Sequence, residues 1–299
     1  MTMSFNVIIG NPPYQGRKSH DGPEGKPPTI WPKFVEKNNT LLKDNGVMIL
    51  VHPAMYRKPG NPLQEVLLNN NRELHIYNNA EAMRTFGGCS TRYDWYVIDK
   101  SYTGKTQVHF EDDTQFEIQL TPEVFLPNGS WSIWEKVQEL GRKVGAIQTH
   151  KKTDRPSLQG EYEVVQTVTK TKGVVIRQTD KKPKSYGVKK VILSETGCQA
   201  LLDWEGVYGT SCNTYYVEIT TKEEGESLVR FVYSKLCHHL VKSCKWGNFR
   251  TEHCIWTYMP NPHNLGITPS CSEEDIYKAF GLSPDEINHI EHFQYGKAR

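Results

Sequence analysis

The sequence predicts an α/β fold in its first part, followed by a second part of α+β type. Apolar, β-branched runs alternate with segments of helical periodicity over about the first hundred residues, and this alternation stops near residue 101. Beyond that point, strand-like segments with many turns come first and helical segments follow. We place the boundary near residue 125, so the predicted domains are residues 1–125 and 126–299.

The first part opens on a predicted buried strand, residues 4–10 (SFNVIIG), which ends at a glycine and two prolines. Apolar spacing predicts a helix at residues 31–42, and Asp44-Asn45-Gly46 is expected to break the chain after it. The other predicted elements are strands at 47–51, 74–77 and 95–98 and a helix at 62–68. Strands separated by helices in this way favour a largely parallel sheet.

The second part contains segments of both kinds and no internal repeat. Strands are predicted within residues 106–120 and 188–193, and helices at 223–240 and 273–280. Many basic residues also gather in one stretch, which could neutralise phosphates or could be an ordinary solvated face. They are Lys151, Lys152, Arg155, Lys170, Lys172, Arg177, Lys181, Lys182, Lys184, Lys189 and Lys190.

Composition limits the class of protein more than it identifies a partner. The formal net charge is only +2, no apolar run approaches the length of a membrane span, and no secretory leader is evident, so we expect a cytoplasmic protein with no membrane partner. Reduced thiols are expected because a chain of 299 residues can build a core without disulfides. The seven scattered cysteines are Cys89, Cys198, Cys212, Cys237, Cys244, Cys254 and Cys271. None of them forms a paired C-x-x-C, so no metal site is expected.

The motif that carries chemistry is Asn11-Pro12-Pro13-Tyr14, directly after the first strand. The lone pair of an aromatic amino group is delocalised into its ring, which makes the nitrogen a poor nucleophile. An acceptor that binds the amino protons localises that lone pair. The Asn11 side-chain oxygen and the Pro12 carbonyl offer two acceptors, and the prolines hold them in place. A rigid turn without chemistry is the structural alternative.

Tyr14 completes this interpretation by offering a flat face for a base. Stacking on an aromatic side chain contributes about 1–3 kcal/mol per base. An amino group inside a duplex is enclosed, so the target base would have to be flipped out of the helix. The motif therefore predicts methylation of an amino group by positioning and electrostatics, with no covalent enzyme intermediate.

These residues resemble those of a known family. FNVIIGNPPYQ is similar to motif IV of the amino-methyltransferases that use S-adenosylmethionine, and LLKDNGVMILVHPAMYR and FGGCSTRYDWYVIDK resemble later parts of adenine-specific DNA methyltransferases of the type II restriction–modification class. The resemblance implies a partial Rossmann-like methyltransferase sheet and an enzyme that methylates adenine N6. It also implies an aromatic residue against the flipped base, for which Tyr93 is the first candidate and Trp95 the second. Core packing is the alternative for both.

The C-terminal part resembles the target-recognition region of the same family in the stretches KKVILSETG, YGTSCNTYYVEI and IYKAFGLSPDEINHIE. The resemblance implies that this part binds double-stranded DNA and reads its sequence. Lysines would mostly position the DNA backbone. The candidate DNA contacts are Lys181, Lys182, Lys184, Tyr186, Trp246 and Arg250.

One expected part of the family is missing from the sequence. Members carry a glycine-rich motif for S-adenosylmethionine upstream of the Asn-Pro-Pro-Tyr loop, whereas ten residues precede Asn11 here. Neither Phe86-Gly87-Gly88 nor Tyr295-Gly296 follows a suitable strand with an acidic partner. The first strand is then expected at a sheet edge, where an apolar strand invites pairing with another chain.

Three explanations stay open: a second chain supplies the cofactor half, the start is truncated, or the protein is a degenerate relative that only binds DNA. The leading hypothesis is an adenine-specific DNA methyltransferase, whole or as one part of a split enzyme. The same four-residue motif also occurs in methyltransferases that act on a protein glutamine amide or on rRNA. A long, basic C-terminal part suits DNA better than a short peptide.

Overall fold

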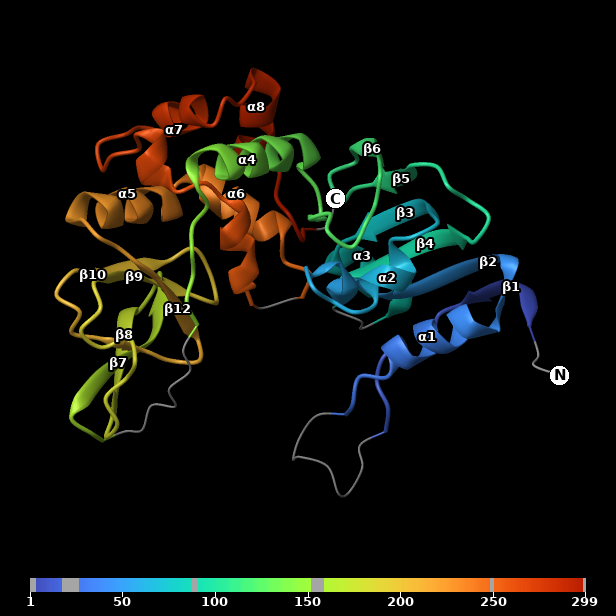
Figure 1. Ribbon diagram of the computed structural model, residues 1–299, viewed down its shortest axis with the longest axis horizontal. Helices are drawn as coiled ribbons and strands as arrows, with labels where there is room; N and C mark the ends of the chain where they lie inside the picture. The colour runs from blue at the N-terminus through green and yellow to red at the C-terminus, as the bar shows by residue number, and fades with distance from the viewer. Residues whose placement is uncertain (1–3, 18–26, 88–90, 152–158, 248–249, 298–299) are drawn as a thin grey trace. The chain divides into compact units, whose positions relative to one another are not determined.

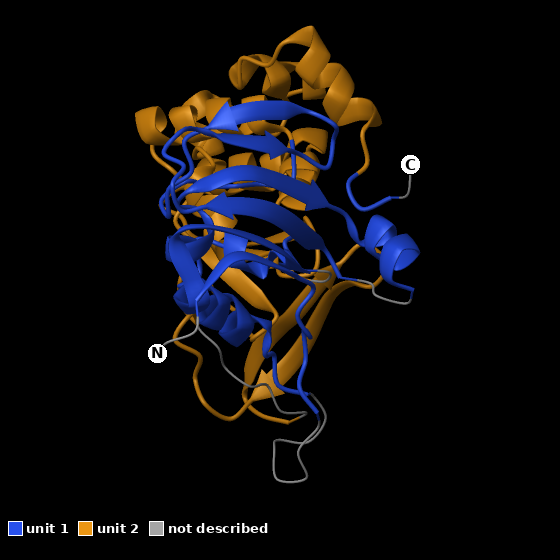
Figure 2. Cartoon of the chain, turned by 90° about the vertical axis from the view of Figure 1, so that its right-hand side faces the viewer, with its two compact units in different colours: residues 1–129, 246–248, 295–299 blue, residues 130–245, 249–294 orange. Residues whose placement is uncertain are grey.

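The computed structural model describes residues 4–17, 27–87, 91–151, 159–247 and 250–297 (Figure 1). The chain forms two compact units (Figure 2). Unit 1 comprises Met1–Gly129, Trp246–Asn248 and Tyr295–Arg299, and unit 2 comprises Ser130–Lys245 and Phe249–Gln294. Unit 1 thus includes residues 126–129 and two short later segments, all of which lie within the predicted second domain, residues 126–299. The roles assigned to the two predicted domains stay predictions.

Unit 1 is a mixed sheet with helices, and its strand order is β1-β2-β4-β3-β5-β6. β1 is parallel to β2 and β3 to β5, whereas β4 runs antiparallel to both β2 and β3. The strands are β1 (Phe5–Gly10), β2 (Leu42–Pro53), β3 (Asn71–Tyr77), β4 (Tyr93–Asp99), β5 (Thr106–His109) and β6 (Gln115–Ile118). The helices are α1 (Trp31–Leu41), η1 (Ala54–Arg57), α2 (Gln64–Leu67) and α3 (Asn79–Phe86).

The prediction of a largely parallel sheet is therefore wrong at β4. An apolar run shows that a strand is buried, but its direction depends on which partners it finds. In β4, buried Asp94, Tyr96 and Ile98 alternate with half-buried residues, which is the pattern of a sheet with one well-covered face. The predicted break at Asp44-Asn45-Gly46 is also wrong, because these residues lie inside β2, where the register with β1 shifts.

Local sequence explains how the helices of unit 1 begin and what α1 buries. Pro32 lies in the first turn of α1, where its missing N–H costs nothing, and Trp31 and Val35 form the buried side of this helix. Figure 1 shows α1 alongside β2. At α3, Asn78 and Glu81 form a capping box that satisfies the first backbone N–H groups. This short helix was not predicted from the sequence.

Unit 2 contains two three-stranded sheets and several helices. The sheet orders are β11-β7-β8 and β10-β9-β12, and Val165, Val168, Ile192 and Tyr216 form a core cluster. The strands are β7 (Tyr162–Thr169), β8 (Gly173–Thr179), β9 (Lys190–Ser194), β10 (Ala200–Asp203), β11 (Gly209–Thr210) and β12 (Thr214–Glu218). The helices are α4 (Trp131–Val144), α5 (Lys222–Val232), α6 (Lys235–Ser243), η2 (His253–Tyr258), η3 (Pro262–Leu265), α7 (Glu273–Ala279) and α8 (Pro284–His292).

The single helix predicted at residues 223–240 is two helices, α5 and α6. Ser234 adopts an extended backbone between them, and its side chain accepts a hydrogen bond from the backbone N–H of Cys237. A serine in this position ends one helix and caps the next, although the apolar spacing continues across it. Within the described parts of both units, no helix combines the length and apolarity needed to cross a membrane.

Candidate functional site

The Asn11-Pro12-Pro13-Tyr14 loop lies at the carboxyl end of β1, one residue beyond the pairing of Gly10 with Leu50 of β2. Asn11 and Pro13 are exposed, Pro12 is buried and Tyr14 is half-buried. The chain after the loop is held in place, because Ile30 N donates to Tyr14 O over 3.1 Å and Gly16 N donates to Pro28 O over 2.8 Å. The loop therefore presents the Asn11 amide to solvent from an anchored backbone.

β1 is the first strand in the sheet order, so one of its sides has no neighbour in the six-stranded sheet. Its apolar side chains are also unusually open: Phe5 is 40% exposed, Val7 55% and Ile9 71%. An apolar edge strand of this kind can pair with a further strand. The expectation that residues 5–9 form an edge strand agrees with this arrangement.

An aromatic cluster is buried around the end of β2, the strand next to the loop. The ring of His52 stacks on Trp31 with a centroid distance of 4.3 Å and contacts Tyr56 and Tyr96 edge-on. The Pro53 carbonyl, 3.1 Å away, can only accept, so Nδ1 of His52 carries the proton and Nε2 accepts from the Tyr96 hydroxyl over 2.9 Å. Burial lowers the pKa of His52 to about 4, against an opposing effect of the bond to Pro53.

This histidine gives unit 1 a predicted sensitivity to acid. Because its pKa in the folded state is depressed from 6.5 to about 4, the neutral ring stabilises the fold above pH 6.5, and this contribution is lost as the pH falls toward 4. The loss amounts to about 3 kcal/mol over that range. Urea unfolding at pH 7 and pH 5 should show about 2 kcal/mol of this loss, because pH 5 is still about one unit above the folded-state pKa of about 4.

The control is a histidine that is largely exposed. His52→Phe should flatten the pH dependence while keeping a ring against Trp31, and His150→Gln, which alters a side chain 44% exposed, should leave it unchanged. Equal pH dependence in wild type and His52→Phe would show that other groups cause the acid sensitivity.

Tyr93 begins β4 beside Pro53 of β2 and Tyr77 of β3, at the same edge of the sheet as the ends of those strands. Its side chain is 6% exposed, stacks on Tyr77 at 5.2 Å and meets Phe86 edge-on at 5.1 Å. Burial raises its pKa. Tyr77 and Phe86 thus pack against the Tyr93 ring, and its role in stacking on a flipped base stays a prediction. Trp95, the second candidate, is half-buried and stacks on His75 at 3.8 Å.

A buried ion pair fixes this end of the sheet, and it was missed in the sequence. Arg57 Nε lies 2.7 Å from Asp94 Oδ2, and both side chains are 0% exposed. The guanidinium also donates to the carbonyls of Leu126 and Pro127 and to Asn128 Oδ1. Burial raises the pKa of Asp94, and Arg57 opposes that rise. The pair thus ties η1, β4 and residues 126–128 together next to Tyr93.

Four of the candidate DNA contacts lie together after β8 in unit 2. Lys181, Lys182 and Lys184 are exposed and Tyr186 is half-buried, with Lys182 Nζ 5.7 Å from the centre of the Tyr186 ring. Arg250 is exposed in the same unit, 3.4 Å from Glu195. The three lysines and Arg250 can therefore reach a partner in solution, which is what a contact with DNA phosphates requires.

The position of Trp246 does not support a DNA contact. Its side chain is 1% exposed, its Nε1 donates to Leu126 O over 2.9 Å, and its ring meets Phe125 edge-on. A tryptophan whose ring and N–H are both used inside a unit has no free face for a nucleic acid. Sequence alone could not separate this buried indole from a surface one.

The basic stretch also divides into surface and structural members. Lys190 is buried and pairs with Asp203 over 2.6 Å, Lys151 pairs with Glu195, and Lys189 lies 3.9 Å above the Trp204 ring. Lys170 lines a separate pocket of about 280 Å³ together with Lys242 and Lys245. Lys152, Arg155 and Cys89 lie outside the described residues. Among the described cysteines, Cys198 and Cys237 are buried free thiols, and Cys244 is also buried.

Comparison with known proteins relates the loop-bearing part of the chain to a family. Residues 1–86, which include Asn11-Pro12-Pro13-Tyr14, match the family model of the Eco57I restriction-modification methylase. No match was found among curated proteins. The match covers β1, α1, β2 and β3, and the first 86 residues are thus similar to a restriction-modification methylase.

Two solved structures of restriction enzymes are similar to the chain over most of its length. One is the type IIG restriction endonuclease BpuSI, at 12% identity and a TM-score of 0.29, covering 88% of this chain and 44% of that protein. The other is the type IIL restriction-modification enzyme MmeI in complex with DNA, at 8% identity and a TM-score of 0.44, covering 96% of this chain and 54% of that protein. The chain thus spans about half the length of each.

Proposed function

We propose that the chain is the amino-binding and DNA-binding part of an adenine-specific DNA methyltransferase. The observation that carries this proposal is the placement of Asn11-Pro12-Pro13-Tyr14 at the carboxyl end of a parallel strand, with Asn11 exposed, inside the segment that matches a restriction-modification methylase. In open sheets of this kind, ligands bind outside the carboxyl ends of the strands. A partial Rossmann-like sheet is part of the same proposal.

The chemistry assigned to this chain is the binding of the acceptor nitrogen. Asn11 Oδ1 and the Pro12 carbonyl accept the two amino protons of a flipped adenine, which draws the nitrogen toward tetrahedral geometry and localises its lone pair. Tyr14 stacks on the base. The anchoring of Tyr14 O and Gly16 N to residues 28–30 keeps the acceptors in place while the base enters.

The methyl group would come from S-adenosylmethionine, and the residues described here do not form a complete site for it. β1 ends at Gly10-Asn11 and β2 at His52-Pro53, and neither end has the glycine-rich turn with a carboxylate that holds a nucleoside. We therefore assign no role in binding S-adenosylmethionine to the described residues. The open edge of β1, with Val7 and Ile9 exposed, supports the proposal that further strands, from another segment or a second chain, supply that half.

The test of the proposed function is methyl transfer from labelled S-adenosylmethionine to duplex DNA, with the product base identified by mass spectrometry. N6-methyladenine supports the proposal. A glutamine-containing peptide and rRNA are offered in parallel assays. Transfer of the labelled methyl group to either one, and not to DNA, would show that this molecule is the substrate. The assay is run with and without the segment or chain that supplies the S-adenosylmethionine half. DNA binding without transfer in both cases would favour the non-catalytic alternative, which the exposed lysines of unit 2 also support.

DNA affinity should fall steeply with salt and depend on the lysines after β8. Replacing Lys181, Lys182 and Lys184 together by glutamine should lower the slope of log K against log salt by up to about 3, because each phosphate contact releases about one counterion. Fluorescence anisotropy with a labelled duplex from 50 to 200 mM salt, roughly the range over which such contacts are lost, measures the slope.

Two further variants make this test specific. Lys143→Gln removes an exposed lysine that pairs with Glu139 within α4 and should not change the slope. Lys170→Gln with Lys242→Gln removes two of the lysines that line the 280 Å³ pocket. A slope that drops only in this second variant would contradict the assignment to residues 181–184 and place the DNA backbone at the pocket.

A further inference from the structure

Three side chains with metal-binding groups lie on one face of the unit 1 sheet, across β3 and β5. Glu73 and His75 are two residues apart on β3, so both point to the same side. His109 is the direct neighbour of His75 in the parallel pairing of β3 with β5. A carboxylate and two imidazoles are thereby brought together by strand alternation and register alone.

The donor atoms of these side chains converge. Glu73 Oε1 lies 2.7 Å from His75 Nε2 and 3.5 Å from His109 Nε2, so both imidazoles direct the same nitrogen at one oxygen. One ligand atom from each residue lies within 4.8 Å of the others. Among the described residues, these three are the one set of three or more histidine, cysteine or acidic side chains whose ligand atoms lie within 4.8 Å of one another.

We propose that Glu73, His75 and His109 bind a divalent transition-metal cation of the zinc class through one carboxylate oxygen and the two Nε2 atoms. Two histidines and one carboxylate are a ligand set that such cations accept, at metal–ligand distances of about 2.0–2.2 Å. Three protein ligands leave a coordination position for water or an anion. This inference does not depend on the proposed methyltransferase function.

One rearrangement accompanies binding, and the structure indicates which side chain makes it. The His75 and His109 rings are stacked at 3.9 Å and 8°, whereas ring-nitrogen lone pairs lie in the ring planes and must converge on a metal. His75 is held by Trp95 on its other face, 3.8 Å away and nearly parallel. His109, the outer ring of the stack, therefore turns about its soft terminal torsion to bring Nε2 to the metal.

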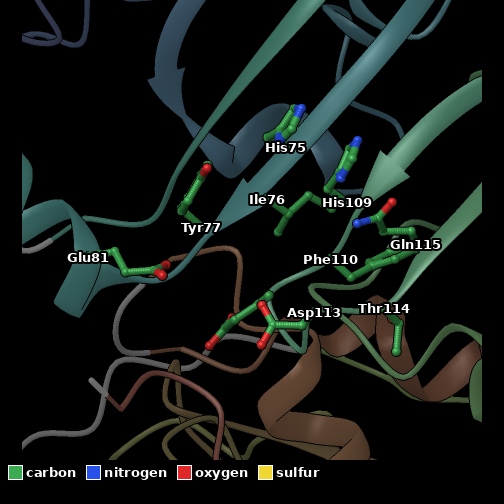
Figure 3. A pocket seen from close by; sticks show the side chains of 10 residues that line it. His75, Ile76, Tyr77, Glu81, His109, Phe110, Asp113, Thr114 and Gln115 are labelled. Atoms are coloured by element: carbon green, nitrogen blue, oxygen red, sulfur yellow. The ribbon is translucent and has the colours of Figure 1, made fainter. Parts of the chain in front are cut away.

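His75 and His109 border a pocket of about 210 Å³, and Figure 3 shows the two rings side by side on neighbouring strands. Glu81 and Asp113 also line this pocket, and the Glu81 carboxylate is held in the capping box of α3.

The competing explanation is a hydrogen-bonded cluster in which Glu73 accepts from one or both histidines. Equilibrium dialysis of the full-length chain against Zn²⁺ separates the two. We expect one Zn²⁺ per chain with a dissociation constant on the order of micromolar or below. His109→Gln and Glu73→Gln should each weaken binding by at least about 100-fold. His150→Gln, which alters a His–Glu pair 3.9 Å apart, is the matched control and should bind as wild type does.

Two measurements keep the test decisive. Zn²⁺ should raise the melting temperature of wild type and of His150→Gln but not that of His109→Gln. A cooperative melting transition in His109→Gln shows that this variant is folded. Co²⁺ in place of Zn²⁺ should give visible ligand-field bands without the near-ultraviolet band of thiolate ligands, because the proposed ligands contain no sulfur. Wild-type-like binding by both variants, a thiolate band, or no binding up to about 100 µM Zn²⁺ would each overturn the proposal.

Discussion

Replacing Arg57 by methionine should destabilise unit 1 by about 3–5 kcal/mol, because the change leaves the Asp94 carboxylate buried without its partner. Asp94 would then keep only the Tyr56 hydroxyl and the weaker charge interaction with Arg92. The acceptors at Leu126, Pro127 and Asn128 would each lose a donor. Urea unfolding monitored by circular dichroism measures the loss.

The pH dependence of this variant has a defined sign. Burial already raises the pKa of Asp94, and removal of Arg57 raises it further. A carboxyl whose pKa is raised on folding stabilises most at low pH, in its neutral form, and this contribution is lost as the pH rises. The deficit of Arg57→Met relative to wild type should therefore be smaller at pH 5 than at pH 8.

Two companion variants separate the ion pair from general damage. Arg57→Met combined with Asp94→Leu should be more stable than Arg57→Met alone, because no unpaired charge stays buried. Lys143→Met breaks the exposed pair between Lys143 and Glu139, whose side chains are 65% and 56% exposed, and should cost much less stability than Arg57→Met. Equal losses for Arg57→Met and Lys143→Met would contradict the role given to the buried pair.

Asn11→Ala should lower the rate of methyl transfer to duplex DNA by about 10²–10³-fold, the range seen when one preorganised hydrogen-bonding partner of a reacting group is removed. This prediction rests on the proposed function. Asn11 is exposed, so its truncation removes an acceptor without opening a cavity in the fold. Single-turnover transfer at saturating DNA, with DNA affinity measured separately, isolates the chemical step.

The expected result is a loss in rate with DNA affinity unchanged within about twofold, because the lysines proposed to position DNA lie elsewhere in the chain. Gln15→Ala alters another exposed polar side chain one residue beyond the motif and should keep the wild-type rate. Asn11→Asp keeps a side-chain acceptor, so its rate of methyl transfer should lie between those of Asn11→Ala and wild type. If Asn11→Ala transfers methyl groups at the wild-type rate, Asn11 is not the amino-group acceptor.

Local sequence predicted the strands on either side of the Asn11 loop, because short apolar runs bounded by glycine and proline mark strands. The prediction that residues 4–10 form a buried strand is wrong, because β1 lies at the sheet edge with Phe5, Val7 and Ile9 exposed. Local sequence could not give the direction of β4, since burial of Tyr96 and Ile98 looks the same for either orientation. Arg57 and Asp94 are 37 residues apart, and only the sheet brings them together. The sequence shows that Glu73 and His75 are two residues apart, as side chains on one face of a strand are. His109 joins them only through the pairing of β3 with β5, which no local sequence pattern encodes.

The position of β4 between β2 and β3 also has a consequence for the order in which the chain can assemble. His52 of β2 pairs with Asp94 of β4, so β2 can meet β1 early but must wait for about forty further residues to complete its other side. At synthesis rates of roughly 5–20 residues per second, that wait is about 2–8 seconds on the ribosome. During this interval the hydrogen-bonding edge of β2 that later pairs with β4 is open to wrong strand partners on the nascent chain.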